Sequence, residues 1–571
     1  MKKLLKYLAE YKKESFLSPL FKMLEASFEL LVPLVVASMI DIGIGNADKS
    51  RVLKCFFIMV ILGLVGFLAA CTAQYFAAKA ATGFSRNLRH DLFKHILSLN
   101  FSEIDELGTS TMITRMTADV NTVQNGVNMF LRLFLRSPFI VAGAAFMAFT
   151  IDFKAALIFV VVIAVLFLAV GLIMKINIPQ IKNVQKKLDR VLGLTRENLS
   201  GARVIRAFTQ EDEQLELFTQ TNNELTGLQL LAGRVSALTN PLTYVIINMA
   251  IAYLIISGGN QVYKGILTPG QVVALYNYMS QILLELIKFA GLIVTINKAL
   301  ASANRISDIF DIKSEKSGSV KDAAEKDVAI EFKNVSLCYH EGSDEALSDI
   351  SFALKKGQTM GIIGGTGAGK TSLINLIPGF YKATKGEVLV NGINVNEYDN
   401  ETLRSQVGMV LQKAVLFKGT IAENLRWGND DASDEELMNA IDMAVATDVV
   451  DAKGGLDAVI EQNGRNLSGG QRQRLTIARA LVKKPKILIL DDASSALDNV
   501  TDLKLRQNIK AIQEDNTVII VSQRTASVQN ADVILVLDDG QLVGMGTHGE
   551  LLKTCEVYKE IYDSQFKKEA E

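Results

Sequence analysis

Six long apolar stretches in roughly the first 300 residues restrict the fold of this chain more than any other feature of its sequence. A helix that crosses a bilayer needs about 20 consecutive, mostly apolar residues, and each stretch is close to that length. The expected membrane spans are residues 16–40, 55–78, 130–150, 155–174, 241–258 and 271–295. The N-terminal half of the chain is therefore predicted to be a multi-pass α-helical membrane domain.

The connection after the fourth span indicates the orientation of the chain. Between positions 175 and 206 it carries eight Lys and Arg residues against two acidic residues. Positively charged connections favour the cytoplasmic side of a membrane. Six spans also return the chain to the side on which it began. Both arguments predict a protein of the plasma (inner) membrane whose C-terminal half is cytoplasmic.

The connections after the second and fourth spans are long, at about 50 to 65 residues, and carry helical patterns without an apolar run. They predict helices that leave the bilayer, turn in the cytoplasm and return. The turns at residues 101–111 and 206–218 are expected to contact the C-terminal half of the chain. The alternative is that both are solvated loop tips.

The N-terminus does not resemble a secretory signal, because Glu10, Lys12 and Lys13 precede any long apolar run. Residues 2–14 instead predict a short amphipathic helix that lies on the membrane surface. Its apolar face is expected to contain Leu4, Leu5, Leu8 and Tyr11.

Charged side chains inside the spans are costly, so each one requires an explanation. Glu285 and Lys288 are three residues apart in the last span, share a helix face and can pair. Glu29 lies near the middle of the first span. These groups form a polar patch in a translocation cavity, or an internal ion pair, or they lie near the cytoplasmic interface and extend toward it. Arg132 and Arg136, at the start of the third span, are expected to mark the membrane interface.

Residues 313–327 are polar and have no apolar pattern, which is typical of a linker. The predicted organisation is a transmembrane domain at 1–312, a linker at 313–327 and a soluble domain at 328–571. After the linker, residues 329–335 alternate between apolar and polar side chains, as a strand does.

A glycine-rich phosphate loop follows the apolar run 360–363. Its residues match G-x-x-x-x-G-K-[ST] at every fixed position: Gly364, Gly365, Thr366, Gly367, Ala368, Gly369, Lys370 and Thr371. The glycines let the backbone turn its N–H groups toward phosphate oxygens. Lys370 is expected to reach the β- and γ-phosphates, Thr371 to hold Mg²⁺ and Ser372 to open the next helix.

Two further segments complete the phosphate chemistry. Residues 486–490 form a buried strand that ends in Asp491, which is expected to lie beside the phosphate-loop strand and to hold Mg²⁺. Before it, a serine and two glycines open an apolar helix and offer free N–H groups to a second phosphate. This segment consists of Leu467, Ser468, Gly469, Gly470 and Gln471.

The Leu-Ser-Gly-Gly-Gln segment lies between the phosphate loop and the strand that ends in Asp491, and it resembles the signature of ABC ATPases. Six spans before one such domain resemble an ABC exporter half-transporter. The implied fold is an α-helical transmembrane domain with long cytoplasmic extensions and an α/β P-loop ATPase domain. The resemblance implies that Tyr339 stacks on adenine, although a core tyrosine is the alternative. It implies that Gln412 senses Mg²⁺ and that Asp498 belongs to the D-loop. Two such domains sandwich two ATP molecules in this family, so the two phosphate devices serve different nucleotides.

Two positions depart from the family pattern. The residue after Asp491 is normally Glu and activates water, but here it is Asp492, which is one methylene shorter. The switch residue is normally His, but here it is Gln523, which cannot carry a positive charge. The predicted result is a site that binds ATP and hydrolyses it slowly, within a heterodimer whose partner half-transporter supplies the usual residues. The alternative is a fully active homodimer.

The expected function is the export of hydrophobic or amphipathic compounds, driven by ATP with Mg²⁺, in contact with membrane lipid. Alternatives are a lipid flippase, a peptide exporter and a regulatory membrane ATPase that transports nothing. A net charge of −1 argues against a nucleic-acid partner. The four cysteines have no metal-ligand spacing.

Overall fold

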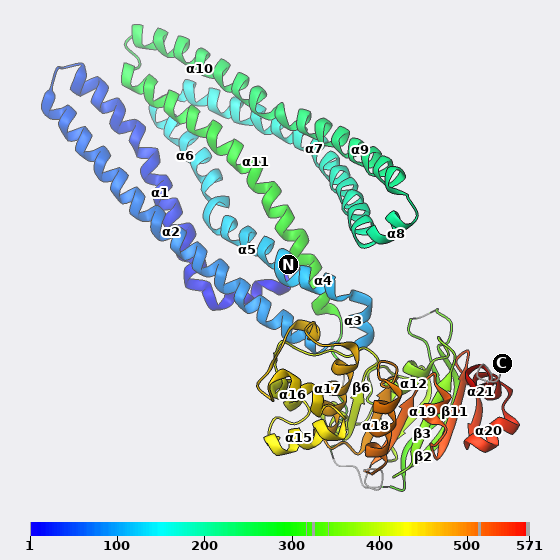
Figure 1. The fold of residues 1–571 in the computed structure, drawn as a ribbon. Coiled ribbons are helices and arrows are strands. Elements are labelled where there is room, and N and C mark those ends of the chain that lie inside the picture. The colour runs from blue at the N-terminus through cyan, green and yellow to red at the C-terminus, as the bar shows by residue number, and fades with distance from the viewer. Residues whose placement is uncertain (1, 316, 322–325, 341, 512–515, 567–571) are drawn as a thin grey trace. The chain divides into compact units, whose positions relative to one another are not determined.

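The computed structural model describes residues 2–315, 317–321, 326–340, 342–511 and 516–566 (Figure 1). The chain divides into two compact units, and each is described separately below. The membrane unit contains Met1–Leu97 and Thr109–Ile312, and the ATPase unit contains Ser98–Gly108 and Lys313–Glu571. Residues 316 and 322–325 of the predicted linker lie outside the described residues.

The membrane unit is built from long helices. In chain order they are η1 (Lys2–Tyr11), α1 (Lys12–Ser38), η2 (Met39–Ile44), α2 (Lys49–Leu97), α4 (Thr109–Thr114), η3 (Arg115–Asp119), α5 (Val120–Met129), η4 (Phe130–Phe134), α6 (Arg136–Ile151), α7 (Phe153–Ser200), α8 (Ala202–Ala207), α9 (Glu211–Ala237), α10 (Thr239–Tyr263) and α11 (Pro269–Asp311). Six helical segments of the described chain are long and apolar enough to cross a membrane, which confirms the six predicted spans.

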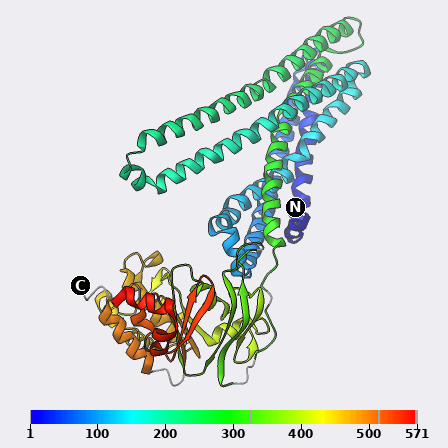
Figure 2. The same cartoon turned by 90° about the vertical axis from the view of Figure 1, so that its right-hand side faces the viewer.

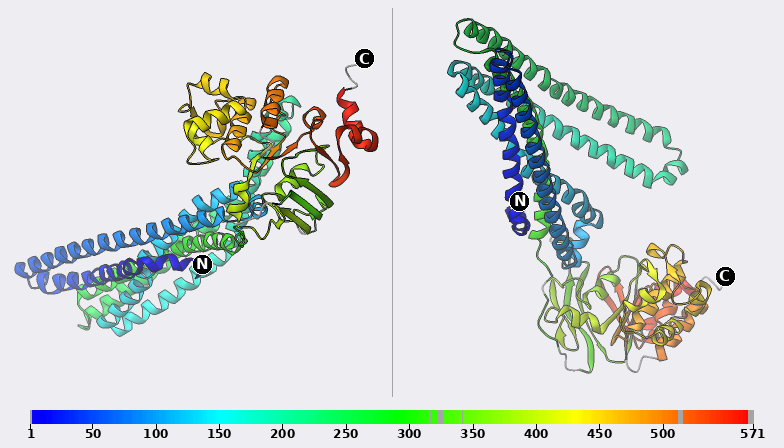
Figure 3. Two further views of the ribbon diagram at one scale, coloured as in Figure 1. Left: turned by 90° about the horizontal axis from the view of Figure 1, so that it is seen from below. Right: turned by 90° about the vertical axis from the view of Figure 1, so that its left-hand side faces the viewer.

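The helices continue well beyond the predicted spans, as the long connections required. Helices α1 and α2 lie side by side along their length (Figure 3). Helices α7 and α9 also pack on each other, and they leave the rest of the bundle as a hairpin that ends at α8 (Figure 2). The second turn is therefore earlier and shorter than predicted. Residues 211–218 belong to the long helix α9, because acidic residues at its start favour a helix N-terminus.

The N-terminal segment is a 3-10 helix, and its buried face differs from the predicted one at Leu5 and Tyr7, whereas Leu8 and Tyr11 of the predicted face are half-buried. A 3-10 helix has three residues per turn, and residues i and i+3 therefore share a face. Leu4 and Tyr7 are buried, whereas Leu5 is 49% exposed. Tyr7 meets the ring of Phe84 on α2 edge-on, with 6.2 Å between ring centroids. The buried face of η1 thus packs against α2 of its own unit.

An ionic cluster around the buried Arg136 and Glu285 joins α1, α6 and α11 inside the membrane unit. The Arg136 guanidinium donates from Nη1 to Glu285 Oε1 and from Nη2 to Glu29 Oε2, both at 2.6 Å. Ser137 Oγ donates to the second oxygen of Glu285 at 2.8 Å. Lys288 Nζ lies 3.0 Å from Glu285 Oε1, which confirms the predicted pair.

The position of Arg136 was predicted wrongly. It does not mark an interface with solvent but is buried between two acids. Burial of one charge costs several kcal/mol, and two carboxylates with good hydrogen-bond geometry offset that cost. The internal ion pair, one of the predicted interpretations of the intramembrane acids, is therefore present in the structure.

The ATPase unit contains a parallel sheet and a smaller antiparallel one. The larger sheet has the order β12-β11-β3-β10-β9-β6, in which β12 alone pairs antiparallel. Its strands are β3 (Thr359–Gly364), β6 (Val407–Val410), β9 (Ile487–Asp491), β10 (Thr517–Val521), β11 (Val533–Asp538) and β12 (Gln541–Gly546). The second sheet, in the order β2-β1-β4-β5, contains β1 (Val328–Leu337), β2 (Leu347–Lys355), β4 (Lys385–Val390) and β5 (Ile393–Asn394). A short pair is formed by β7 (Gly419–Thr420) and β8 (Val459–Ile460).

Helices surround these sheets. They are α3 (Phe101–Leu107), α12 (Lys370–Leu376), α13 (Asn400–Gln406), α14 (Ile421–Arg426), α15 (Asp434–Met443), α16 (Thr447–Lys453), η5 (Gln462–Gly464), α17 (Gly469–Val482), α18 (Asn499–Ala511), α19 (Thr525–Val528), α20 (His548–Thr554) and α21 (Glu556–Phe566). The central strands β3 and β9 are buried along nearly their whole length, because helices cover both faces of a parallel sheet. The predicted fold class is confirmed.

One predicted neighbour relation is wrong. Strand β9, which carries Asp491, does not lie beside the phosphate-loop strand β3, because β10 pairs with both of them. The β10 residues are as apolar as those of β9, and apolar pattern alone does not give strand order. The carboxyl ends of all three parallel strands still meet at one edge of the sheet, where ligands bind in folds of this kind.

Candidate ATP-binding and hydrolysis site

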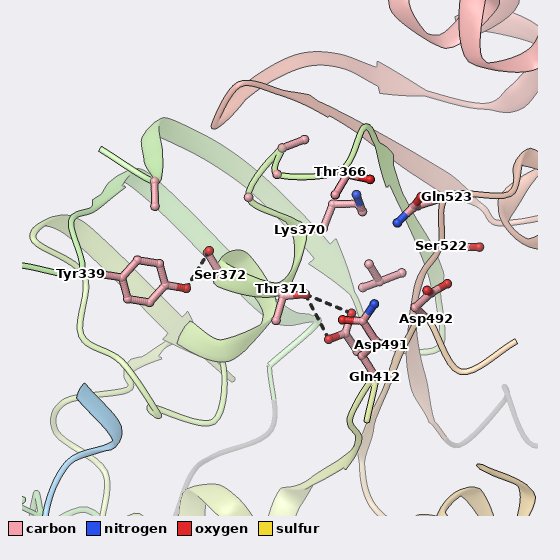
Figure 4. Close-up of a pocket in the computed structure, with 15 residues that line it drawn as sticks. Tyr339, Thr366, Lys370, Thr371, Ser372, Gln412, Asp491, Asp492, Ser522 and Gln523 are labelled. Atoms are coloured by element: carbon pink, nitrogen blue, oxygen red, sulfur yellow. Dashed lines mark hydrogen bonds between the residues drawn. The ribbon is translucent and has the colours of Figure 1, made fainter. Parts of the chain in front are cut away.

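A cavity of about 320 Å³ opens at this edge of the sheet (Figure 4). Its lining contains most of the predicted site residues. They are Tyr339, Thr366, Gly367, Ala368, Gly369, Lys370, Thr371, Ser372, Gln412, Asp491, Asp492 and Gln523, and Ala346, Val521 and Ser522 complete the wall. The backbone of Gly364 and Gly365 forms the adjoining start of the phosphate loop. Segments far apart in the chain are thus brought to one place.

The phosphate loop joins β3 to α12. Gly367 and Gly369 have φ values of 87° and 89°, in the left-handed region that glycine adopts without a Cβ clash. A Cβ at Gly369 would lie 2.8 Å from the carbonyl oxygen of Ala346. The loop therefore needs glycine at this position both for its conformation and for space.

The Lys370 ammonium is held over the loop by the loop's own backbone. Its Nζ donates to the carbonyl oxygens of Gly364 at 2.9 Å and Gly365 at 2.6 Å. Burial lowers the pKa of Lys370, while the charges of Asp492 and Asp491 oppose that shift. A buried cation in a glycine-rich loop at a helix N-terminus is suited to bind a polyphosphate.

A hydroxyl, a carboxylate and an amide lie together at the cavity floor. Thr371 Oγ1 donates to Asp491 Oδ2 at 3.1 Å, and Gln412 lines the same cavity. Burial raises the pKa of Asp491, and the nearby charge of Asp492 raises it further. Oxygen donors of this kind suit Mg²⁺. A bound magnesium–nucleotide would supply charge neutralisation at the phosphates, and Thr371, Asp491 and Gln412 are the residues placed to hold its metal.

Tyr339 forms one end of the cavity. Its hydroxyl donates to Ser372 Oγ at 2.7 Å, and 38% of its surface is exposed. Its ring meets the ring of Tyr381 edge-on, with 5.1 Å between centroids and 88° between planes. This exposed position differs from that of a core tyrosine. Adenine stacking by Tyr339 stays a prediction.

The two atypical residues stand at the ends of β9 and β10. Asp492 has a φ of 48°, which is uncommon for a residue with a side chain, and its N–H donates to the carbonyl of Val521 at 3.0 Å. Gln523 and Lys370 both point into the cavity (Figure 4). Ser522, which also lines it, was not singled out from the sequence, although its place directly after a buried strand was a signal.

The second phosphate device lies on another part of the domain. Ser468 caps α17, because Gln471 N donates to Ser468 Oγ at 3.3 Å and Ser468 N donates to Gln471 Oε1 at 2.9 Å. Asp498 Oδ2 accepts from Thr501 N at 3.1 Å ahead of α18. Within the described residues, neither Asp498 nor any member of 467–471 lines the cavity. The signature therefore is free to serve a different nucleotide.

The first cytoplasmic turn packs on the ATPase unit, as predicted. Helix α3 belongs to that unit, and Phe101 stacks on Phe380 with 4.3 Å between ring centroids. The Tyr381 hydroxyl donates to the carboxylate of Asp105. The second turn, around α8, belongs to the membrane unit, and its contact with an ATPase domain stays a prediction.

Removal of the bond between Tyr381 and Asp105 is expected to loosen the first turn. A hydrogen bond to a charged acceptor at a half-exposed site contributes about 1 kcal/mol. Tyr381→Phe and Asp105→Ala should each speed amide hydrogen exchange in residues 101–107 about fivefold, and the double variant no more than either alone. Tyr263→Phe, at a 93% exposed tyrosine, is the matched control. If the double variant speeds exchange by the product of the two single effects, the two residues do not act through one shared hydrogen bond.

Two family models match the chain. The ABC transporter transmembrane region matches residues 15–286, and the ABC transporter model matches residues 347–495. The first covers the spans, and the second covers the phosphate loop, the signature and Asp491. These matches agree with the two units of the structure.

Relatives match over nearly the whole chain. The ABC transporter ATP-binding protein YfiB of Bacillus subtilis (strain 168) is 35% identical over 100% of this chain and 99% of its own. The ATP-dependent lipid A-core flippase of Photobacterium profundum is 27% identical over 99% of this chain and 97% of its own.

A solved structure shares the fold. It is that of a bacterial Atm1-family ABC exporter with ATP bound, with a TM-score of 0.82 and 22% identity over 98% of this chain and 99% of that one. Motifs, units and relatives lead to the same conclusion. The chain belongs to the ABC transporter family, with one membrane-spanning domain fused to one ATPase domain.

Proposed function

We propose that this chain is one half of a heterodimeric exporter of hydrophobic or amphipathic compounds in the plasma membrane. We also propose that the ATP site at its own phosphate loop hydrolyses ATP slowly. The observation that carries the proposal is the composition of one cavity. The groups proposed to bind the triphosphate and Mg²⁺, namely Lys370, Thr371, Gln412 and Asp491, line it, whereas the two positions expected to act on water hold Asp492 and Gln523.

The shortened acid is the first part of the argument. Asp492 is fixed by its backbone bond to Val521 and by a left-handed φ, so its carboxylate cannot advance by a simple backbone adjustment. A carboxylate withdrawn by about 1 Å from the attacking water can cost about a hundredfold in rate. Gln523 can donate to a phosphate but cannot hold a positive charge or pass on a proton.

The intact signature is the second part. Ser468 and Gly469 are exposed, and a Cβ at Gly469 would meet nothing within 4 Å. The capped N-terminus of α17 is thus open to a nucleotide held by another chain. A partner with the usual Glu and His would form a fully competent site against this surface.

A lipid flippase is the second candidate, and a specific observation favours it. Two relatives, from Photobacterium profundum and Pectobacterium atrosepticum, are ATP-dependent lipid A-core flippases at 27% and 28% identity. The intramembrane charges do not decide between the candidates, because Arg136 satisfies Glu29 and Glu285 internally.

Reconstituted vesicles separate the two candidates. We expect ATP-dependent movement of a lipophilic dye at least fivefold above that of a transporter carrying Lys370→Ala, with no movement of a labelled phospholipid. The transported dye should also raise the rate of ATP hydrolysis by the reconstituted transporter. Movement of the phospholipid alone would replace export of small compounds with lipid flipping, and movement of neither would contradict both.

The heterodimer has its own test. Affinity purification of this chain from native membranes should retain, at equal stoichiometry, a second half-transporter with Glu and His at the two altered positions. Recovery of this chain alone would establish a homodimer. Asp492 and Gln523 would then have to support hydrolysis themselves.

A further inference from the structure

The last helix of the described chain holds the loop that carries Gln523. The Gln565 side chain, on α21, donates from Nε2 to the carbonyl oxygen of Gln523 at 2.8 Å. Its Oε1 accepts from the backbone N–H of Thr525 at 2.9 Å. One amide thus binds the backbone on both sides of Arg524, with a donor and an acceptor in the order in which a neighbouring strand would present them.

This clamp supplies a large share of the loop's hydrogen bonds. Strand β10 ends at Val521, and Ser522 N still donates to Ile362 of β3 at 3.0 Å. Arg524 N donates to the Ser522 side chain at 3.0 Å, which is a bond within the loop. Among the described residues, the hydrogen bonds that tie residues 523 and 525 to another element both come from Gln565.

Helix α21 is itself fixed to the rest of the domain. Tyr558 is fully buried in an apolar cluster that also contains Ile363 of β3 and Val528 of α19. The Tyr558 hydroxyl lies 2.7 Å from His548 Nδ1. The helix therefore is anchored both to the strand that leads into the phosphate loop and to the helix that follows the switch loop. Gln565, near its end, is exposed but projects from a rigid base.

We propose that Gln565 is a positioning residue for the switch residue Gln523, so that the C-terminal helix sets the rate at which ATP is hydrolysed in this cavity. The inference rests on the proposed role of the cavity as an ATP site. Gln565 is not among the residues that line the cavity. It acts by fixing the carbonyl of Gln523, and hence the direction of the side chain that enters the cavity.

The polarity of the clamp makes it specific for an amide. Ala at position 565 removes both bonds, and the peptide group after Gln523 then keeps only the bond within the loop, from Arg524 N to the Ser522 side chain. Glu has nearly the same shape and can still accept from Thr525 N–H. It would, however, place a carboxylate oxygen against the carbonyl oxygen of Gln523, and two acceptors repel. Both substitutions should displace Gln523 and leave the phosphate loop in place.

Hydrolysis at this chain's own site can be followed with a photoactivatable azido-ATP labelled at the α- or the γ-phosphate. After cross-linking, the α label on this chain reports binding, and the loss of the γ label relative to it reports hydrolysis, whatever the partner does. In the full assembled transporter, we expect Gln565→Ala and Gln565→Glu to slow the loss of the γ label about tenfold. The α labelling should stay within twofold of the original.

A double variant separates positioning from a merely structural role. If Gln565 acts through Gln523, Gln523→Ala should slow γ-label loss by itself, and addition of Gln565→Ala should slow it no further. Multiplying effects, or a loss of α labelling in Gln565→Ala, would overturn the proposal. So would an unchanged rate in Gln565→Glu. Lys559→Gln, at an exposed position of the same helix, is the control and should change neither label.

The same assay distinguishes failure of the clamp from failure of the proposed function. If the unaltered chain is not labelled, or if Lys370→Ala does not reduce its labelling, the cavity is not an ATP site. If the unaltered chain is labelled and loses the γ label rapidly, the slow-site proposal is wrong. The effect of Gln565 can be measured in that case too.

Discussion

An Asp492→Glu, Gln523→His double variant is expected to hydrolyse ATP at this chain's own site about a hundredfold faster than the unaltered chain. Glu is one methylene longer than Asp, so its carboxylate reaches about 1 Å further toward the attacking water. His adds a group that can carry positive charge beside the γ-phosphate and exchange a proton. The rate is measured as loss of the γ label from the photolabelled chain.

Single variants and a distant one make this result interpretable. Asp492→Glu alone should account for most of the gain, because it moves the group that acts on water. Asp430→Glu makes the same change at an exposed aspartate of the same domain and should have no effect. If the double variant hydrolyses ATP no faster, Asp492 and Gln523 are adequate as they stand. The case for a degenerate site would then fail.

Lys370→Ala is expected to weaken ATP binding to this chain by a hundredfold or more. The Lys370 ammonium is buried, and two loop carbonyls hold it above the phosphate loop. Its removal deletes a charge-assisted contact to each of two phosphates in a poorly solvated site, where each such contact contributes about 1.5–3 kcal/mol. Photolabelling with the α-labelled azido-ATP measures the loss directly.

A matched lysine shows whether the effect belongs to the site. Lys382 is exposed and lies beyond the end of α12 in the same domain, so Lys382→Ala should leave labelling unchanged. Because the proposed partner keeps its own phosphate loop, labelling of the partner should persist in the Lys370→Ala assembly. Normal labelling of Lys370→Ala would show that this cavity does not bind the nucleotide's phosphates.

Local patterns in the sequence were sufficient for the membrane spans and the phosphate-binding segments. A bilayer imposes a length and an apolar composition on each span, and both can be counted along the chain. The phosphate loop depends on neighbouring residues, since Gly367 and Gly369 provide the backbone turns and Lys370 follows directly. The same is true of the α17 cap, where Ser468 and Gln471 are three residues apart.

Relations between distant residues were decided by the tertiary structure. Arg136 looks like an interface residue in sequence, and only the packing of α1, α6 and α11 surrounds it with Glu29 and Glu285. Strand order is of the same kind, because β10 enters between β3 and β9 without a signal in its own residues. Gln565 and its hydrogen-bond partner Gln523 are 42 positions apart in the sequence, and the packing of the helices brings them together.

The sequence by itself thus determined a membrane-spanning chain with a phosphate loop and a signature, and it placed Asp492 and Gln523 at the two positions for which we propose slow hydrolysis. Such features are written in short segments whose local conformation depends on near neighbours. The tertiary structure alone decided which of these segments share a cavity, which charges are neutralised and what holds Gln523 in place. Those properties arise from contacts between segments that burial of apolar surface brings together, and no local pattern encodes them.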